Sequence, residues 1–212
     1  MFADRVEAGR VLAAQLLAAG PWPDAVVLGI PRGGVVVAAE VAHALALPLD
    51  VVVAAKVSAL SSPEYAVGAV TADGEVLVNA AAGFSAEEVR ALAGPARAKI
   101  ARSLEVFRAG REPLDLERGA AIVVDDGLAT GLTALAAVEY VRRCGATLVV
   151  LAVPVASRGA YELLEPHVDR LVATEVPPQF SAVGKFYARF GQTDDGEVVS
   201  LLAQAAKRST ST

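Results

Sequence analysis

The sequence is poor in residues that build disulfide frameworks and zinc sites. Among 212 residues it has one cysteine, Cys144, and two histidines, His43 and His167. A single cysteine excludes a disulfide within the chain, and we expect Cys144 to be a small structural side chain. The two histidines lack metal-ligand spacing, so we expect structural roles for them as well. This cysteine usage fits a reducing compartment, and we expect a cytoplasmic protein.

Long apolar runs and clusters of positive charge are also missing. The apolar stretches at residues 25–30, 49–55 and 148–156 are far shorter than the roughly 20 residues that cross a bilayer. The first ten residues alternate acidic and basic side chains and have no apolar signal core. The formal net charge is −5, without a lysine or arginine run. We therefore expect no membrane and no nucleic acid among the partners.

Short β-branched runs alternate with alanine-rich helical stretches. This alternation predicts one α/β domain over residues 1–212, doubly wound, with a mostly parallel five-stranded sheet and flanking helices. The predicted strands are residues 25–30, 49–55, 121–124, 147–153 and 168–174. The predicted helices are 4–19, 35–47, 85–107 with a break at Gly94-Pro95, 133–143, 158–164 and one capped by Asp194.

Two segments interrupt the alternation. Residues 67–78 alternate apolar side chains around Ala72-Asp73-Gly74, which predicts a hairpin. Residues 58–65 before it are polar, and we expect residues 57–79 to form a flexible loop and hairpin. Residues 176–192 combine prolines, glycines and aromatics, which is typical of an irregular cap.

The strongest chemical motif lies at residues 121–133. A buried strand runs into Asp125 and Asp126, then a loop of small residues, then a helix. Successive amides of residues 129–133 can form a nest for a phosphate, to which the helix N-terminus adds positive potential. Paired carboxylates at the carboxyl end of a strand suit a diol or metal-bound water. An ordinary acidic turn is the simpler alternative.

Residues 123–133 resemble the signature of type I phosphoribosyltransferases that binds 5-phosphoribosyl-1-pyrophosphate (PRPP). The Asp-Asp-Gly-Leu-Ala-Thr-Gly version is similar to that of adenine phosphoribosyltransferases. The resemblance implies that Asp125 and Asp126 face the ribose hydroxyls and contact Mg²⁺ through water. It assigns the 5-phosphate to a loop made of Ala129, Thr130, Gly131, Leu132 and Thr133.

The sequence departs from this signature at two positions. Leu132 replaces a glycine or serine, which leaves binding through the backbone intact. Ala129 stands where many members have an aspartate that is proposed as a general base, so this chain lacks that base.

Two further elements resemble the family's pyrophosphate site. Pro31, Arg32, Gly33 and Gly34 follow the first strand and resemble the pyrophosphate loop, in which a cis peptide is common. Lys56, at the end of the predicted strand 49–55, is similar to a lysine that contacts pyrophosphate, although Ala55 replaces the arginine often found before it. A plain turn and a solvated strand end are the respective alternatives.

The two irregular segments also have counterparts in the family. Residues 57–79 match a mobile catalytic lid in position, but residues 58–65 contain no lysine or arginine. Residues 176–192 match the hood that binds the acceptor base. Phe180, Phe186 and Tyr187 are candidates to stack on a planar ring and Lys185 to orient it. A surface hairpin and core packing of the cap remain the alternatives.

The resemblance implies a Mg²⁺-dependent phosphoribosyltransferase that moves the phosphoribosyl group of PRPP to a nitrogenous base or nucleotide. Asp125, Asp126, Arg32 and Lys56 are the predicted catalytic residues. A non-catalytic PRPP or nucleotide sensor on the same fold is the main alternative, and a dinucleotide-binding oxidoreductase is disfavoured because no Gly-x-Gly-x-x-Gly follows the first strand. The sequence leaves the oligomeric state open, although homodimers are common in the family.

Overall fold

A five-stranded parallel sheet forms the centre of the protein. The computed structural model describes residues 1–60, 62–108, 112–113, 116 and 119–209, without the side chains of Pro63, Glu64 and Ser209. In spatial order the strands are β2 (Leu49–Val51), β1 (Val26–Gly29), β6 (Ala120–Val124), β7 (Leu148–Val155) and β8 (Arg170–Glu175). Every neighbouring pair is parallel. The predicted α/β class and five-stranded sheet are confirmed.

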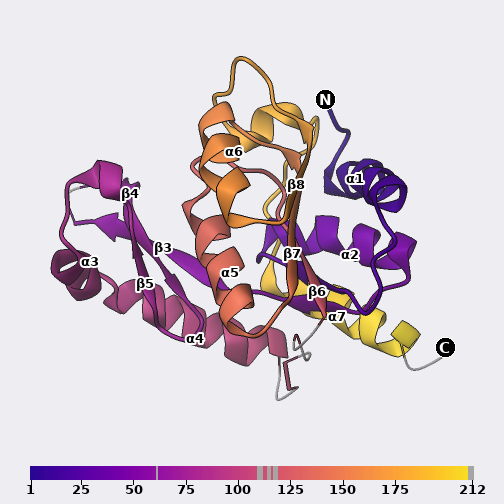
Figure 1. Cartoon of the computed structure of the whole chain (residues 1–212), viewed down its shortest axis with the longest axis horizontal. Helices are drawn as coiled ribbons and strands as arrows, with labels where there is room; N and C mark the ends of the chain where they lie inside the picture. Colours follow the sequence, from indigo (N-terminus) through magenta and orange to yellow (C-terminus); the bar gives the residue numbers. More distant parts are fainter. Residues whose placement is uncertain (61, 109–111, 114–115, 117–118, 210–212) are drawn as a thin grey trace.

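Helices cover both faces of this sheet, as Figure 1 shows. One face carries α1 (Arg5–Ala19), α2 (Gly33–Leu45) and α7 (Asp195–Ser209), and the other carries α5 (Leu132–Arg143) and α6 (Arg158–Leu164). Side chains alternate along β1, so Val27 packs in one core with Leu12 and Val198. Its neighbour Leu28 packs in the other core with Leu135. The sheet is therefore buried on both sides, which explains the continuous apolar strands.

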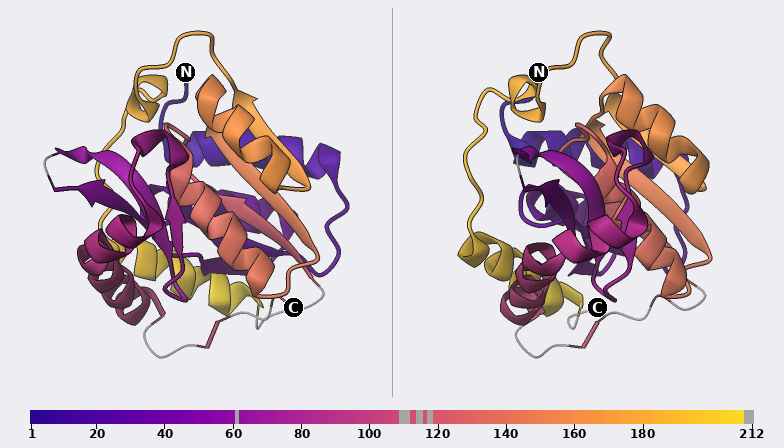
Figure 2. Two further views of the ribbon diagram at one scale, coloured as in Figure 1. Left: turned by 60° about the vertical axis from the view of Figure 1, so that its left-hand side comes forward. Right: turned by 90° about the vertical axis from the view of Figure 1, so that its left-hand side faces the viewer.

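The predicted strand 49–55 is wrong as a single element. β2 ends at Val51, and β3 (Ala54–Ala59) begins a separate antiparallel sheet with β4 (Ser62–Thr71) and β5 (Val76–Val78). Figure 1 shows this second sheet to the left of the main one, and the right-hand view of Figure 2 turns it toward the viewer. Val52 and Val53 stay buried as the chain passes from one sheet to the other. The hydropathy pattern therefore does not show where the chain leaves the main sheet for the second one.

The predicted hairpin around Asp73 is confirmed, and it is tied to the body of the protein. Arg143 in α5 donates hydrogen bonds of 2.9 and 3.0 Å to the two carboxylate oxygens of Asp73. The segment predicted as a polar loop lies largely in β3 and β4, with Leu60 89% exposed at their tip. Ser61 and the side chain of Glu64 lie outside the described residues. Flexibility of residues 57–79 stays a prediction.

The predicted helix break at Gly94-Pro95 is confirmed. Ser85 and Glu88 form a capping box before α3 (Ala86–Leu92), and α4 (Gly94–Arg108) follows and packs against α7 and β3. Short 3₁₀ helices are η1 (Ala80–Ala82), η2 (Glu165–His167) and η3 (Val183–Phe186). Within the described part of the chain, no helix combines the length and apolarity that a membrane span requires.

The carboxyl ends of β1 and β6 meet at one edge of the sheet. Gly29 lies beside Val124, and Val124 lies beside Ala152 of β7. Residues 30–34 and 125–131 follow these two strands directly. Loops at the carboxyl edge of a parallel sheet are where α/β proteins place ligands. The fold therefore brings the two predicted phosphate-binding loops to the same edge.

Candidate active site

Two adjacent carboxylates follow the last residue of β6. Asp125 and Asp126 lie directly after Val124, as the sequence predicts. The Asp125 carboxylate accepts a 2.8 Å hydrogen bond from the amide of Asp126, which fixes its orientation. We refer to these two residues as the acid pair.

Arg5 neutralises one member of the acid pair. Its Nε donates a 2.7 Å hydrogen bond to Asp126 Oδ2, and both side chains are largely buried, at 12% and 17% exposed. The same guanidinium donates to the Gly191 carbonyl at 2.7 Å and lies 3.9 Å from the ring centroid of Phe190. Sequence analysis missed Arg5. One signal in the sequence could have identified it. Arg5 lies in the first turn of a helix, where the helix macrodipole disfavours a positive charge, so a partner of opposite charge is expected.

Burial raises the pKa of Asp125 well above its ordinary value, and the charge of Asp126 raises it further. Burial also raises the pKa of Asp126, against the opposing hydrogen bond and charge of Arg5. Two adjacent buried carboxylates repel each other, so an added cation or hydrogen-bond donor relieves the repulsion. The acid pair is therefore suited to bind hydroxyl groups next to developing positive charge.

The loop after the acid pair keeps its amides available. Leu132 begins α5, and Gly131 precedes it with φ 78°, a conformation that favours glycine. Ser157 anchors the loop, since its Oγ donates to the Ala129 carbonyl at 2.6 Å and its amide donates to the Leu128 carbonyl at 2.8 Å. Within the described residues, the amides of Ala129, Thr130 and Gly131 donate to no protein group. Ala129 and Thr130 are exposed, as a phosphate loop requires.

The loop after β1 lies against the acid pair. Pro31 and Arg32 precede α2, which begins at Gly33, and the peptide bond between Pro31 and Arg32 is cis. A Cβ atom at Gly33 would collide with Asp126 Oδ2 and lie 2.7 Å from Arg5 Nε. A Cβ atom at Gly34 would lie 2.9 Å from the Cα of Asp125. Glycine is therefore required at both positions because the acid pair occupies the space.

Replacing Gly33 with alanine is expected to destabilise the fold by about 2 kcal/mol, the usual scale of overpacking. The added methyl group displaces the Asp126 carboxylate or the Arg5 guanidinium. Urea unfolding measures the loss. The control is Gly159→Ala in α6, where a Cβ meets nothing within 4 Å and stability should rise by up to about 1 kcal/mol. Equal stability of wild type and Gly33→Ala would contradict the contact.

The two cations predicted to contact pyrophosphate, Arg32 and Lys56, lie on different elements of the fold. Arg32 is exposed and pairs with Asp195 at 3.5 Å, between cavities of about 420 and 430 Å³. Lys56 is exposed within β3 and not at a strand end, which corrects the prediction. Ala55 and Val57 on either side of Lys56 are buried in the core on the α4 side, so Lys56 projects from the opposite face of β3.

The hood, residues 176–192, packs on the acid pair and on the N-terminal segment. The hydroxyl of Tyr187 donates a 2.5 Å hydrogen bond to the Asp126 carbonyl, and its ring is 5% exposed beside Phe2 and Phe190. Burial raises the pKa of Tyr187, so the hydroxyl stays a donor. This packing corrects the prediction that Tyr187 stacks on a base and makes it an anchor. Backbone hydrogen bonds of 2.8 Å from Phe2 to Phe186 and from Ala188 to Phe2 complete the attachment.

The other predicted hood residues remain accessible. Phe180 and Phe186 stack on each other, with ring centroids 5.5 Å apart and an interplanar angle of 20°. Lys185 is exposed in η3 between them. These three residues therefore keep the geometry of a candidate base-binding surface.

Changing Tyr187 to phenylalanine is expected to destabilise the protein by about 1 kcal/mol, because the Asp126 carbonyl loses its hydrogen bond. Chemical unfolding followed by tryptophan fluorescence measures this loss. Tyr161→Phe is the matched control, since the hydroxyl of Tyr161 bonds to no group within the described residues. Identical unfolding midpoints for the two variants would show that the Tyr187 bond contributes nothing.

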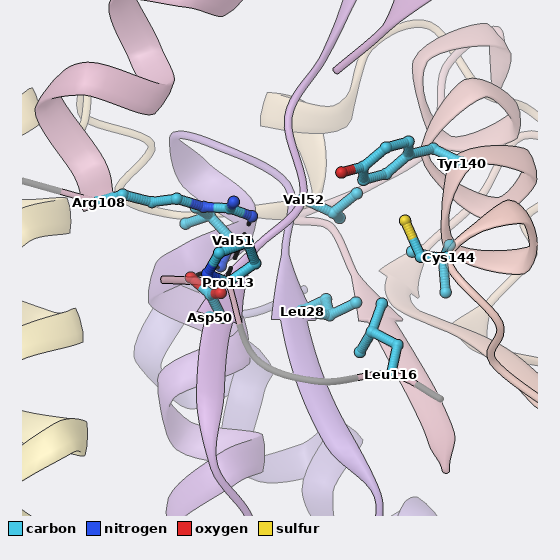
Figure 3. A pocket seen from close by; sticks show the side chains of 10 residues that line it. Leu28, Asp50, Val51, Val52, Arg108, Pro113, Leu116, Tyr140 and Cys144 are labelled. Carbon is cyan, nitrogen blue, oxygen red and sulfur yellow. Dashed lines mark hydrogen bonds and ion pairs between the residues drawn. The ribbon is translucent and has the colours of Figure 1, made fainter. Parts of the chain in front are cut away.

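A separate cavity of about 320 Å³ lies against α5, and none of the predicted site residues lines it (Figure 3). Asp50 and Arg108 line one side, and Tyr140 and Cys144 line the other. Cys144 is only half-buried, and burial raises the pKa of Tyr140 to about 12. The single cysteine is thus remote from the acid pair.

Comparison with known proteins places this geometry in a family. The phosphoribosyl transferase domain profile matches residues 3–187. A Mycobacterium tuberculosis protein, provisionally named as a phosphoribosyl transferase, is 42% identical over 214 residues, covering 97% of this chain and 47% of the relative. The chain thus spans about half the length of the curated relatives it matches.

Two solved structures share the fold of this chain. The crystal structure of TT1426 from Thermus thermophilus is 40% identical, with a TM-score of 0.83 over 96% of this chain and 98% of that one. AQ2163 from Aquifex aeolicus shares the fold alone, at 12% identity and a TM-score of 0.50 over 81% of this chain and 73% of that one. With the acid pair, the amide loop (residues 129–131) and the glycine loop (residues 31–34) at one sheet edge, the chain belongs to the phosphoribosyl transferase domain family.

Proposed function

We propose that this protein binds PRPP and transfers its phosphoribosyl group to a nitrogenous base, with release of pyrophosphate. One observation carries the proposal: the acid pair, the free amides of residues 129–131 and the glycine loop 31–34 meet at a single sheet edge. A sugar that carries phosphate groups at both ends needs these three elements together. Family membership supports the same assignment.

Each element has a defined role in this reaction. Asp125 and Asp126 accept hydrogen bonds from the ribose hydroxyls and favour the positive charge that develops on the sugar. The amides of residues 129–133 and the N-terminus of α5 bind the 5-phosphate. Arg32, Lys56 and loop 31–34 stabilise the negative charge of the leaving pyrophosphate. The bond from C1 to pyrophosphate breaks, a bond from C1 to the base nitrogen forms, and the proton of that nitrogen passes to the released pyrophosphate or to solvent water.

The carboxylates of Asp125 and Asp126 suit a magnesium ion whose other ligands come mainly from the substrate and from water. Within the described residues, no group of three or more His, Cys, Asp or Glu side chains could hold a metal. Mg²⁺ commonly keeps several waters and takes one or two carboxylates together with substrate phosphates. The acid pair would bind such waters, and the ion would supply charge neutralisation for the pyrophosphate.

The decisive experiment is to mix protein, PRPP and Mg²⁺ with a panel of purine and pyrimidine bases and to measure pyrophosphate. Release that requires one particular base would support the transferase. Omitting the base and substituting the acid pair are the controls, and both should abolish release.

A PRPP sensor remains the second candidate, because Ala129 removes the usual candidate base and residues 58–65 lack a cation. Binding of PRPP measured by calorimetry, without turnover on any base, would favour the sensor. Failure of the wild-type protein to bind PRPP would exclude both functions.

A further inference from the structure

The cavity of about 420 Å³ beside Arg32 adjoins the pyrophosphate loop, residues 31–34, but not the acid pair. It lies between the start of α2, the middle of α4 and the first residue of α7. The polar residues that line it are Arg32, Lys99, Arg102, Ser103 and Asp195. Neither Asp125 nor Asp126 contributes to its wall, so it is distinct from the ribose site.

The wall of this cavity has an excess of positive charge. It contains three cations and one carboxylate, and that carboxylate, Asp195, already pairs with Arg32 at 3.5 Å. Within the described residues, Lys99 and Arg102 form no hydrogen bond or ion pair. They are three positions apart on α4, so they share one face of the helix and repel each other. Both side chains are exposed, and in a chain with a net charge of −5 they give this cavity a local excess of positive charge.

Two further groups at this cavity can contact an anion. Ser103 follows Arg102 on the same side of α4 and offers a hydroxyl donor. The 15-residue helix α7 also begins at the cavity, but Asp195 and Glu197 in its first turn already place negative charge at its N-terminal end. Arg32 belongs both to this cavity and to the pyrophosphate loop. Arginine pairs bidentately with phosphate oxygens, and lysine contributes a point charge.

We propose that this cavity binds the phosphate or diphosphate group of a small molecule through Lys99 and Arg102, with Arg32 shared with the pyrophosphate loop. The proposal adds α4 to the three elements assigned to PRPP, and where the ligand is PRPP itself it rests on the proposed function. The same chemistry can come from two sources. One is the pyrophosphate group of PRPP itself, and the other is a separate phosphorylated ligand.

Calorimetric titration of the full chain with inorganic pyrophosphate, without magnesium, tests the site. The variant Lys99→Gln with Arg102→Gln should bind pyrophosphate at least about 10-fold more weakly, because two charge-assisted contacts are lost. Arg90→Gln with Arg97→Gln is the matched control. It removes the same charge from exposed residues of α3 and α4 that do not line the cavity, and affinity should stay near wild type. Equal weakening in both variants, or none in the first, would overturn the proposal.

A PRPP titration of the same variants separates the two sources. If the cavity takes the pyrophosphate group of PRPP, the Lys99 and Arg102 variant loses PRPP affinity by the same factor as pyrophosphate affinity. If it takes a separate ligand, PRPP affinity is unchanged and pyrophosphate still binds to the PRPP-saturated protein. Either result supports the anion site. If the wild-type protein does not bind PRPP at all, the proposed function is wrong, and this result is distinct from a failure of the anion site.

Discussion

Replacing Asp125 and Asp126 together with asparagine is expected to lower PRPP affinity at least about 100-fold, because each lost charge-assisted hydrogen bond contributes about 1.5–3 kcal/mol. Both carboxylates lie where β6 opens onto the amide loop, so no other acid of this loop can replace them. Calorimetry with PRPP and Mg²⁺ measures the effect. Affinity within a few-fold of wild type would contradict the site.

The control for this variant must remove the same charge elsewhere. Asp24→Asn with Glu105→Gln does so at two exposed positions. Asp24 has a positive φ of 53°, which asparagine tolerates well. PRPP affinity of this control should equal that of wild type. A similar loss in the control would mean that net charge, and not the acid pair, governs binding.

Replacing Arg5 with alanine is expected to cost about 3 kcal/mol of stability, the scale for breaking a largely buried ion pair. The Asp126 carboxylate then lies unpaired at 17% exposure, and its pKa rises further because Arg5 no longer lowers it. The ionised carboxylate carries the penalty, so the loss of stability is full above the raised pKa of Asp126 and shrinks as pH falls through that pKa. Urea unfolding at several pH values measures this dependence.

Arg10→Ala is the matched control, on the same helix. Arg10 pairs with Glu40 at 2.9 Å, but its side chain is 70% exposed, so its loss should cost only about 0.5 kcal/mol. Adding Asp126→Asn to Arg5→Ala should recover part of the lost stability, because the unpaired charge disappears. No recovery would show that Arg5 acts through its contacts with Phe190 and Gly191 instead of through Asp126.

The acid pair could be predicted from sequence because its signal is local. A buried run ends at Val124, two acids follow, and a small-residue loop leads into α5. The glycine loop was predictable for the same reason. Its closeness to the acid pair followed from the rule that parallel strands present their carboxyl ends at one edge.

The remaining features depend on contacts between residues that are far apart in the chain. Arg5 reaches Asp126 across 121 positions, and no periodicity or motif joins them. The sequence suggested that the ring of Tyr187 is accessible to a ligand, but in the structure it packs against Phe2. The departure of β3 from the main sheet was hidden because Val52 and Val53 remain buried on the way.

The attachment of the hood limits how this protein could be re-engineered for another acceptor. Val183 would lie 2.6 Å from a Cβ at Gly127, while Tyr187 and Gly191 bond to Asp126 and Arg5. A transplanted segment 176–192 that lacked these three attachments would disturb the acid pair as well as the surface formed by Phe180, Lys185 and Phe186. Segment exchange should therefore vary only Phe180, Lys185 and Phe186 and keep the attachment points unchanged.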